Sequence, residues 1–346
     1  MGPEAMSTVV PPLPDASIPA GLRVPATMRA AVLDAPGGAD AFRIAEVPAP
    51  TPVNAELLVR VVAAGVNPID LRTRAGDGVA AAIGSWPAVL GLDFSGVVVT
   101  SPYEAFPLQP GDEVFGISGA PRTAGSYAEL VTACATSVVR KPPILSHVEA
   151  AGVPLAALTA WGVVVELAKA HEGQRILIHA ASGGVGHLAV QLAAYFGAHV
   201  IAAAEEPDAA WLRDLGAREV VDTARMRFED VLDRVDAVID LVGDRRDRTG
   251  PRSLRVLRRN GLLVNVPSGS WPGLVTDCTA AGVRCTTFRA APDAAVLAVV
   301  ARLIGTGDIR VHVDAVHPLE EVAAAHRLLA TGRVRGKAVL RITPPR

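Results

Sequence analysis

Residues 175–205, RILIHAASGGVGHLAVQLAAYFGAHVIAAAE, decide the fold of this chain. The segment opens with an isoleucine-rich run at 175–179 that is too short for a helix. After a glycine-rich turn, Leu188, Leu192 and Phe196 recur at helical spacing, and a second apolar run follows at 199–204. The segment therefore predicts a buried strand, a loop, a helix and a second strand, in that order.

The glycine-rich turn joins the expected strand to the N-terminus of the expected helix. N–H groups there lack partners and the helix dipole is positive, so a pyrophosphate binds if no side chain blocks it. The turn matches G-x-G-x-x-G except for Ala181 at the first position, and the acidic residue of the motif is Glu205. We therefore predict a dinucleotide site that contains Ser182, Gly183, Gly184, Val185, Gly186 and Glu205. The alternative is a tight turn that only packs a helix on a sheet, which explains one glycine better than three.

The composition allows a large buried core and two domains, because half of the 346 residues are hydrophobic. A formal net charge of −2 gives no electrostatic footprint for nucleic acid or for an anionic membrane. No apolar stretch has the length and freedom from charge of a membrane span. We therefore expect small molecules or other protein chains as partners, with neither nucleic acid nor membrane among them.

The cysteines and the N-terminus bear on location. Cys134, Cys278 and Cys285 are widely spaced and form no C-x-x-C pair, so neither a disulfide framework nor a local zinc site is indicated. A reducing, cytoplasmic setting is expected. Residues 1–27 are rich in proline and do not read as a signal peptide, so they are expected to form a disordered lead-in.

Short strands and turns dominate from Met28 to about Lys141. Pro36-Gly37-Gly38 and Pro110-Gly111-Asp112 are among the turns that separate the apolar runs. Many short strands at near-regular spacing predict an antiparallel, partly open β-barrel.

Strand and helix patterns alternate after the glycine-rich turn. Extended patterns recur at REVVDT, DAVIDLVG and GLLVNVPS, and helical patterns at 207–216, 228–235 and 250–259 separate them. VRCTTF (283–288) is a further strand candidate. Such alternation predicts a parallel, doubly wound sheet whose ligand lies at the carboxyl ends of the strands. This places Leu241, Val242, Val266 and Pro267 beside the nicotinamide half of the cofactor.

Six motifs carry a family resemblance. In chain order they are AAGVNPIDLRTRAG (63–76), LGLDFSG (90–96), GDEVFG (111–116), GSYAELV (125–131), PLAALTAW (154–161) and AASGGVG (180–186). Together they resemble the medium-chain dehydrogenase/reductases, and within them the zinc-free quinone oxidoreductase branch that includes zeta-crystallin. The resemblance implies a GroES-like barrel domain formed by 28–150 and 291–346, and a Rossmann domain formed by 151–290. It also implies that the closing strand KAVLRI returns to the barrel.

The zinc ligands of the family's alcohol dehydrogenases are not matched. Their cysteine, histidine and second cysteine fall on Asn67, Leu92 and Leu155, and residues 100–110 hold no cysteine-rich loop. Asparagine and leucine are poor zinc ligands, and none of the eight histidines stands in H-x-x-x-H spacing. We therefore expect no metal site.

The resemblance implies a metal-free hydride transfer. Without a metal, a quinone or an α,β-unsaturated carbonyl is the suitable acceptor, because its conjugation delocalises the charge that a hydride brings. Asn67 and Thr159 resemble the residues that position nicotinamide or substrate. Asp70 and Arg74 match the family pattern D-x-x-x-R-x-G, either as catalytic groups or as an ion pair within the domain. The tyrosine acid of related enoyl-thioester reductases has no counterpart just beyond Asp70.

Two other classes of function stay open. A biosynthetic tailoring enzyme with this fold performs non-redox chemistry such as cyclisation, and a cofactor-binding protein keeps the site without turnover. Reduction of a panel of quinones and enones by the purified protein distinguishes these classes from a reductase.

The cofactor is expected to be NAD(P)H, with NADH favoured. Glu205, Glu206 and Asp208 would repel the 2′-phosphate of NADPH, whereas a carboxylate accepts hydrogen bonds from ribose hydroxyls. Arg225 or Arg245, reaching over from later loops, would reverse that preference. The family also implies a homodimer, for which VRCTTF is a suitable edge strand.

Overall fold

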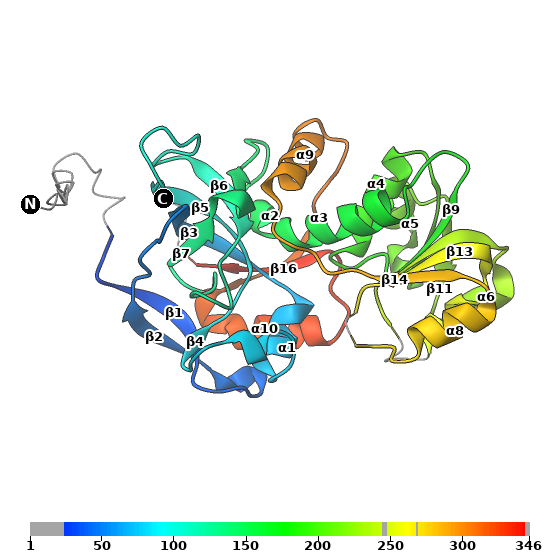
Figure 1. Cartoon of the computed structure of the whole chain (residues 1–346), viewed down its shortest axis with the longest axis horizontal. Coiled ribbons are helices and arrows are strands. Elements are labelled where there is room, and N and C mark those ends of the chain that lie inside the picture. Colours follow the sequence, from blue (N-terminus) through cyan, green and yellow to red (C-terminus); the bar gives the residue numbers. More distant parts are fainter. Residues whose placement is uncertain (1–23, 244–247, 268, 343–346) are drawn as a thin grey trace, which may run out of the picture.

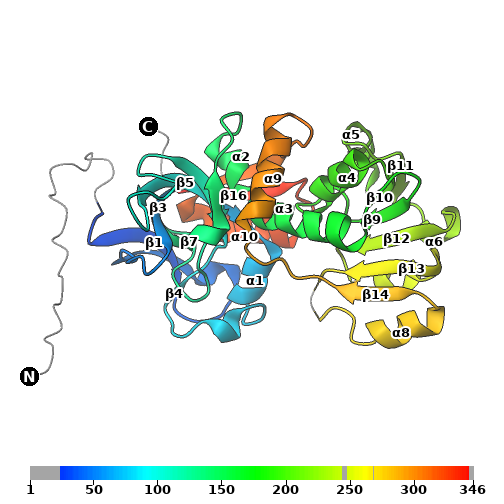
Figure 2. The same ribbon diagram turned by 45° about the horizontal axis from the view of Figure 1, so that its top comes forward.

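The computed structural model describes residues 24–243, 248–267 and 269–342. The lead-in expected over 1–27 lies outside the described residues as far as residue 23, and Thr27 already begins the first strand. The two sheet-bearing parts lie side by side, with helices α3 (Pro154–Trp161) and α9 (Ala294–Gly305) between them (Figures 1 and 2).

The N-terminal part is the expected antiparallel β domain. Its strands are β1 (Thr27–Leu33), β2 (Phe42–Pro48), β3 (Glu56–Val66), β4 (Ala88–Val89), β5 (Asp93–Thr100), β6 (Glu113–Ile117), β7 (Leu130–Cys134) and β8 (Val138–Arg140). They form a three-stranded sheet in the order β2-β1-β4 and most of a seven-stranded sheet, in which β7 pairs with β3. Short helices α1 (Pro68–Arg74) and α2 (His147–Ala151) interrupt the pattern.

The end of the chain completes this barrel. Strands β15 (Val313–Pro318) and β16 (Lys337–Arg341) extend the larger sheet to β15-β16-β3-β5-β6-β8. Strand β16 runs antiparallel to β3, with Ala338 opposite Val66 and Leu340 opposite Ala64. The predicted return of KAVLRI to the barrel is therefore confirmed, and it brings Lys337 beside the start of α1.

The central part is the expected parallel sheet. Its strands are β9 (Arg175–His179), β10 (His199–Ala204), β11 (Glu219–Asp222), β12 (Val235–Asp240), β13 (Leu257–Asn265) and β14 (Arg284–Thr287). Every pairing is parallel, in the order β11-β10-β9-β12-β13-β14. The strand order reverses between β9 and β12, which is where a doubly wound sheet holds its ligand. VRCTTF contributes the edge strand β14.

Helices connect the parallel strands and cover the sheet. They are α4 (Gly186–Tyr195), α5 (Ala209–Asp214), α6 (Phe228–Val231), α7 (Thr249–Ser253) and α8 (Leu274–Ala281), and a π-helical turn, Gly162–Leu167, extends α3. The helix predicted over 250–259 is too long, because α7 ends at Ser253 and Leu257 already belongs to β13. Asn260, at φ 61°, marks the irregular start of that strand. α10 (Val322–Ala330) packs on the barrel.

One hydrophobic cluster spans both parts. It contains Phe115 and Ile117 of the barrel, Ile176 and Ile178 of β9, and Leu297 of α9, all buried. Burial of this kind is worth roughly 25 cal/mol for each Å² of apolar surface removed from water, so the shared cluster holds the two sheets together. Within the described ranges, no helix has both the length and the apolarity to cross a membrane.

Candidate active site

A cavity of about 700 Å³ opens at the carboxyl ends of β9, β10 and β12. Four of the predicted cofactor residues line it: Ser182, Gly183, Glu205 and Val242. Its other wall comes from the segment that leads into β16, namely Gly332, Arg333, Val334 and Arg335. The position agrees with the site expected for a dinucleotide in a doubly wound sheet.

Glycine is needed at the three positions of the loop for different structural reasons. A Cβ atom on Gly183 would meet only the Ala180 carbonyl oxygen at 3.3 Å, so its other side is open to a ligand. A Cβ on Gly186 would lie 2.2 Å from that same oxygen, so glycine is required there for packing. A Cβ on Gly184 would lie 3.0 Å from the Lys337 side chain. One side of the loop therefore packs against the start of β16, and the other side is open to a ligand. The Gly336 N–H donates a hydrogen bond to the Ser182 carbonyl at 2.7 Å.

The remaining predicted cofactor residues do not line this cavity. Gly186 begins α4, Val185 is the N-cap of that helix, and Gly184 lies against the Lys337 side chain. Leu241 and Val266 pack against the shared hydrophobic cluster. Pro267 lies next to Val266, beyond the carboxyl end of β13. Arg225 lies 3.5 Å from Asp222 and does not line the cavity, and Arg245 lies outside the described residues.

Charges of both signs line the cofactor cavity. Arg252, Arg333 and Arg335 are there with Glu205, Asp208 and Asp314. Arg335 Nε donates to Asp208 Oδ1 at 2.7 Å, and its guanidinium lies 5.3 Å from the centre of the Trp211 ring. Asp208, one of the three carboxylates expected to repel a 2′-phosphate, is therefore paired with an arginine from the other end of the chain.

The amide of Asn67 is fixed by two charged groups. Its Nδ2 donates to Asp93 Oδ2 at 2.9 Å, and its Oδ1 accepts a hydrogen bond from Lys337 Nζ. Lys337 Nζ also lies 3.6 Å from Asp93 Oδ2, and Leu155 N–H donates to Asp93 Oδ1 at 2.8 Å. All three polar side chains are buried. Because an ammonium only donates and a carboxylate only accepts, the amide has one orientation, and its second N–H stays available.

Asp70 stands one helical turn further along. Its Oδ2 accepts hydrogen bonds from Asn67 N–H at 2.9 Å and from the Tyr127 hydroxyl at 3.2 Å. Burial raises the pKa of Asp70 to about 7, and the Asn67 backbone hydrogen bond opposes the shift. Burial also raises the pKa of Asp93, against the nearby Lys337 ammonium. The ion pair between Asp70 and Arg74 that the sequence suggested is not formed.

Tyr127 reaches the N-P-x-D segment from a distant part of the sequence. Its hydroxyl donates to Asp70 and lies 3.2 Å from His326 Nε2. Burial raises the pKa of Tyr127 well above its ordinary value, and burial lowers that of His326 to about 3. A fully buried phenol bonded to a carboxyl group holds that group in place and is poorly suited to act as the acid itself.

Thr159 lies close to this network without facing the cofactor cavity. It is buried in α3, and its hydroxyl donates to the Leu155 carbonyl at 2.7 Å. Its oxygen therefore remains only as an acceptor. The structure thus places Asn67, Asp70 and Thr159 around Asp93 and Leu155.

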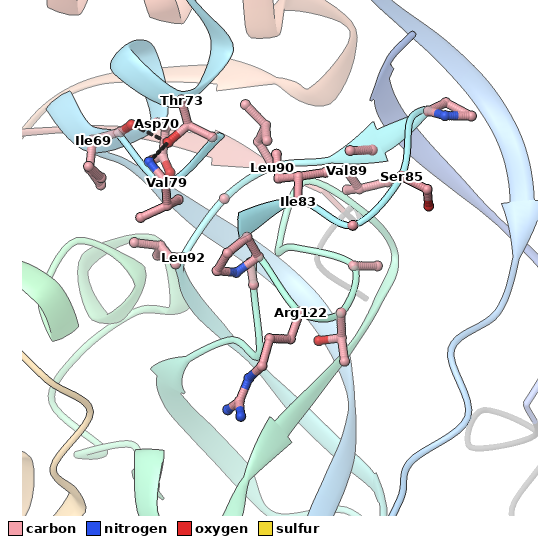
Figure 3. A pocket seen from close by; sticks show the side chains of 18 residues that line it. Ile69, Asp70, Thr73, Val79, Ile83, Ser85, Val89, Leu90, Leu92 and Arg122 are labelled. Carbon is pink, nitrogen blue, oxygen red and sulfur yellow. Dashed lines mark hydrogen bonds between the residues drawn. The ribbon is translucent and has the colours of Figure 1, made fainter. Parts of the chain in front are cut away.

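A second cavity, of about 270 Å³, lies in the barrel next to α1 (Figure 3). Asp70, Thr73 and Val79 stand at one end, Leu92 lines an inner wall, and Arg122 extends at the side. Apart from Asp70 and Arg122, the lining carries no charge and is largely apolar. Leu92 also packs against the cluster shared with the parallel sheet. A largely hydrophobic small molecule suits such a cavity.

The side chains at the family's zinc positions do not suit a zinc ion. Asn67, Leu92 and Leu155 supply at most one weak ligand, and the Asp93 carboxylate is engaged by Asn67, Lys337 and Leu155. Among the residues that the structure describes, no group of three or more His, Cys, Asp or Glu side chains is arranged to hold a metal ion. An ammonium, Lys337, stands beside Asn67 and Asp93.

Several of these site residues were not predicted. Lys337, Tyr127 and His326 come from distant parts of the chain, and Arg333 and Arg335 come from the turn before β16. The one available signal was Lys337, which begins the apolar strand KAVLRI. A strand that is expected to be buried also buries the charge of its lysine, so a partner for that charge could have been expected.

A parallel sheet with a glycine loop, joined to a barrel that holds the buried polar network of Asn67, Asp93 and Lys337, is the arrangement expected of a dinucleotide-dependent oxidoreductase. Family models agree: the alcohol dehydrogenase GroES-like domain matches residues 53–143, and zinc-binding dehydrogenase matches residues 215–340. The second description names a family, and its members' zinc ligands are not reproduced here.

Individual relatives match most of the chain in sequence. The chain is 30% identical over 324 residues to the mitochondrial NAD(P)H oxidoreductase RTN4IP1 of Danio rerio, covering 83% of this chain and 84% of the relative. It is 32% identical over 334 residues to 2-methylene-furan-3-one reductase of Solanum lycopersicum, covering 93% of this chain and 81% of the relative.

Solved structures agree in fold. The quinone oxidoreductase of Coxiella burnetii superposes with a TM-score of 0.86 at 34% identity, covering 92% of this chain and 100% of that one. The Escherichia coli quinone oxidoreductase complexed with NADPH superposes with a TM-score of 0.81 at 25% identity, covering 91% of this chain and 100% of that one. The chain belongs to the medium-chain dehydrogenase/reductase family, in its quinone oxidoreductase-like branch, as an NAD(P)H-dependent oxidoreductase of the quinone and enone reductase type.

Proposed function

We propose that the protein transfers a hydride to a quinone, or to the β-carbon of an α,β-unsaturated carbonyl compound, without zinc. The observation that carries the proposal is the fixed amide of Asn67, whose two charged partners occupy its oxygen and one N–H and leave the second N–H for a substrate oxygen. Asn67 occupies a position that carries a zinc ligand in the family's alcohol dehydrogenases, so a hydrogen-bond donor takes the place of the metal. A single donor suffices for an acceptor whose conjugation already spreads the incoming charge.

The residues of the site divide the work. When bound, the reduced nicotinamide supplies the hydride. Asn67 holds the acceptor oxygen and stabilises the enolate or phenolate that forms. Lys337 holds Asn67 in place and keeps a positive charge beside the developing negative one. Apolar residues such as Leu92 exclude water from the acceptor.

Spectrophotometry tests the proposal. Wild-type protein treated with a chelator is expected to oxidise reduced cofactor with quinones or enones in the panel, and Asn67→Ala is expected to lower kcat about 100-fold, the usual loss for one oxyanion donor. Cofactor affinity, measured by fluorescence titration, is the control and is expected to change little. Activity that appears only after zinc is added would contradict a metal-free reaction. Turnover of neither class would favour the tailoring or binding function.

NADH is proposed as the preferred cofactor. Glu205 lines the cavity at the end of β10, where a carboxylate accepts hydrogen bonds from ribose hydroxyls, and Arg335 is already paired with Asp208. Arg333 is the alternative base, because its guanidinium forms no ion pair with any described residue. Titration of NADH and NADPH into wild type, Glu205→Ser and Arg333→Ala decides between them. Tighter NADPH binding by wild type that is lost in Arg333→Ala would show that Arg333 receives the 2′-phosphate.

Two further proposals concern assembly and location. A homodimer is proposed through the edge strand β14, whose test is given below. A cytoplasmic location is proposed because Cys134, Cys278 and Cys285 are free thiols, as a reducing compartment maintains. The Danio rerio relative is described as mitochondrial, so fractionation of the expressing cells with compartment markers is the relevant measurement.

A further inference from the structure

Asp70 is a buried carboxyl group that opens onto the barrel cavity. Its side chain is 3% exposed, and it lines that cavity together with Ile69, Thr73 and Val79 (Figure 3). Oδ2 accepts two hydrogen bonds, whereas Oδ1 has no hydrogen-bond partner among the described residues. Oδ1 is therefore the oxygen that is left for a bound substrate.

The partners of Asp70 fix the position of its proton. Oδ2 faces two donors, Asn67 N–H and the Tyr127 hydroxyl, so a proton on the carboxyl group must reside on Oδ1. Tyr127 donates its only proton to Asp70, so the contact with His326 requires that Nε2–H donates to the phenol oxygen. His326 Nδ1 then carries no proton, which agrees with its lack of any hydrogen-bond partner. Each hydrogen in the chain His326, Tyr127, Asp70 thus has one position.

The charges around Asp70 suit an acid that gains and loses a proton near neutral pH. Burial and the Asp93 carboxylate favour the neutral form, while Asn67 N–H, the Lys337 ammonium and the Tyr127 hydroxyl favour the carboxylate. His326 is neutral at this pH, and the Arg74 guanidinium acts on the pKa values of Tyr127 and His326, whereas Asp70 makes no ion pair with it. These opposing effects leave the pKa of Asp70 at about 7.

We propose that Asp70 is the acid that protonates the α-carbon of a reduced enone. The inference rests on the proposed hydride transfer. Addition of a hydride to the β-carbon leaves an enolate whose oxygen is held by Asn67. As the carbonyl π bond re-forms, the α-carbon takes the proton from Asp70 Oδ1, the O–H bond breaks, and Asp70 becomes a carboxylate. Water then returns one proton to Asp70, so each turnover consumes one hydride and one proton.

The positions of the two groups agree with this role. Asn67 is the N-cap of α1 and Asp70 is the third residue of that helix, so the oxygen donor and the acid lie within one turn. The α-carbon of an enolate is separated from its oxygen by a single carbon atom. An acid and an oxygen donor that serve one enolate must therefore be neighbours, as these two residues are.

Quinones provide an internal comparison. Hydride addition to a quinone ends in a hydroquinone whose new protons are on oxygen, and oxygen atoms exchange protons rapidly with water. Protonation of carbon is slow by comparison and benefits from a positioned acid. The two acceptor classes should therefore depend differently on Asp70.

Asp70→Asn is the test variant, because an asparagine Oδ1 still accepts from Asn67 N–H and Tyr127 but carries no acidic proton. Asp77→Asn, at an exposed position after the same helix, is the matched control. Asp70→Asn is expected to lower enone turnover by about 100-fold or more, the usual contribution of an acid. Quinone turnover is expected to fall by less than tenfold, and Asp77→Asn to behave as wild type.

Two measurements distinguish a role of Asp70 as the proton donor from a merely structural role. In D2O, wild type is expected to place deuterium on one face of the α-carbon of a cyclic, α-methyl enone, and Asp70→Asn to place it on both faces. Wild-type kcat for that enone is expected to be constant below about pH 7 and to fall above it, as the acid form of Asp70 is lost. Quinone turnover should lack this dependence.

Equal losses for enone and quinone, or stereospecific deuteration by Asp70→Asn, would overturn the inference while hydride transfer stands. Turnover of neither class by wild type would overturn both proposals. If Asp70→Asn does not fold, deuteration of both faces by wild type overturns the inference, and deuteration of one face with the enone-specific pH dependence supports it.

Discussion

A single lysine supplies the positive charge of the buried network that it forms with Asn67 and Asp93. Lys337 is one of three lysines in the chain, and 270 residues separate it from Asn67, to which it donates. Its side chain is 3% exposed, and its ammonium lies 3.6 Å from the fully buried carboxylate of Asp93. Removal of one member of a buried pair leaves an uncompensated charge and costs more than the pair itself contributes.

Lys337→Met is therefore expected to lower the free energy of unfolding by about 3–5 kcal/mol, because Asp93 stays buried without a cation. Chemical denaturation at pH 7.5 measures the loss. Lys169→Met, at an exposed position, is the control and should leave stability almost unchanged. A Lys337→Met protein as stable as the wild type would mean that Asp93 is neutral in the folded state.

At the scale of elements, the edge of the parallel sheet is the feature most open to a partner. Strand β14 pairs only with β13 in the described chain, and its backbone on the other side is available to a second strand. Val275 on the neighbouring helix α8 is 69% exposed, which adds apolar surface beside that edge. Both observations favour pairing of two copies along β14.

Thr287→Lys is expected to convert the proposed dimer to a monomer, since two edge strands that pair would bring like charges together. Light scattering at micromolar concentrations measures the mass of each variant. Thr136→Lys, at an exposed position of the barrel, is the control and should remain dimeric. A wild-type mass equal to one chain would rule out this assembly.

Elements whose identity depends on local sequence could be predicted. The glycine loop and the six parallel strands follow from periodicity and motif, because neighbouring residues decide them, whereas the return of β16 to the barrel was implied by the family resemblance. The helix over 250–259 was predicted too long, since the sheet recruits Leu257 into β13 by pairing that no local pattern encodes. Contacts such as Lys337 with Asn67, or Tyr127 with Asp70, depend on how distant strands register, so the sequence could not reveal them.

At the scale of the whole molecule, three buried histidines make stability depend on pH. Burial lowers the pKa values of His179 and His187 to about 4 and that of His326 to about 3, from an ordinary value of 6.5. Below pH 6.5 the unfolded chain binds protons that the folded protein does not. The contribution of these rings is therefore complete above pH 6.5 and is lost as the pH falls toward 4. Asp70, whose pKa is raised from 3.8, has the opposite effect in that range.

With three histidines opposed by Asp70, unfolding takes up about two protons. The free energy of unfolding is therefore expected to fall by roughly 3 kcal/mol per pH unit at most between pH 6 and pH 4. Denaturation curves at several pH values measure this slope. His326→Gln should reduce it by about one group, and the exposed His171→Gln should not. A stability that is constant from pH 6.5 to pH 5 would show that the rings are protonated in the folded state.

The proposed function requires the intact two-part molecule to deliver a hydride to a conjugated carbon without a metal. The most direct measurement uses zinc-depleted protein, an enone, and reduced cofactor that carries deuterium at C4 of the nicotinamide. Both cofactor stereoisomers are supplied separately, and mass spectrometry with NMR locates the label in the product. Deuterium on the β-carbon from one of the two stereoisomers is the predicted result. Deuterium on the carbonyl carbon, or transfer that requires added zinc, would contradict it.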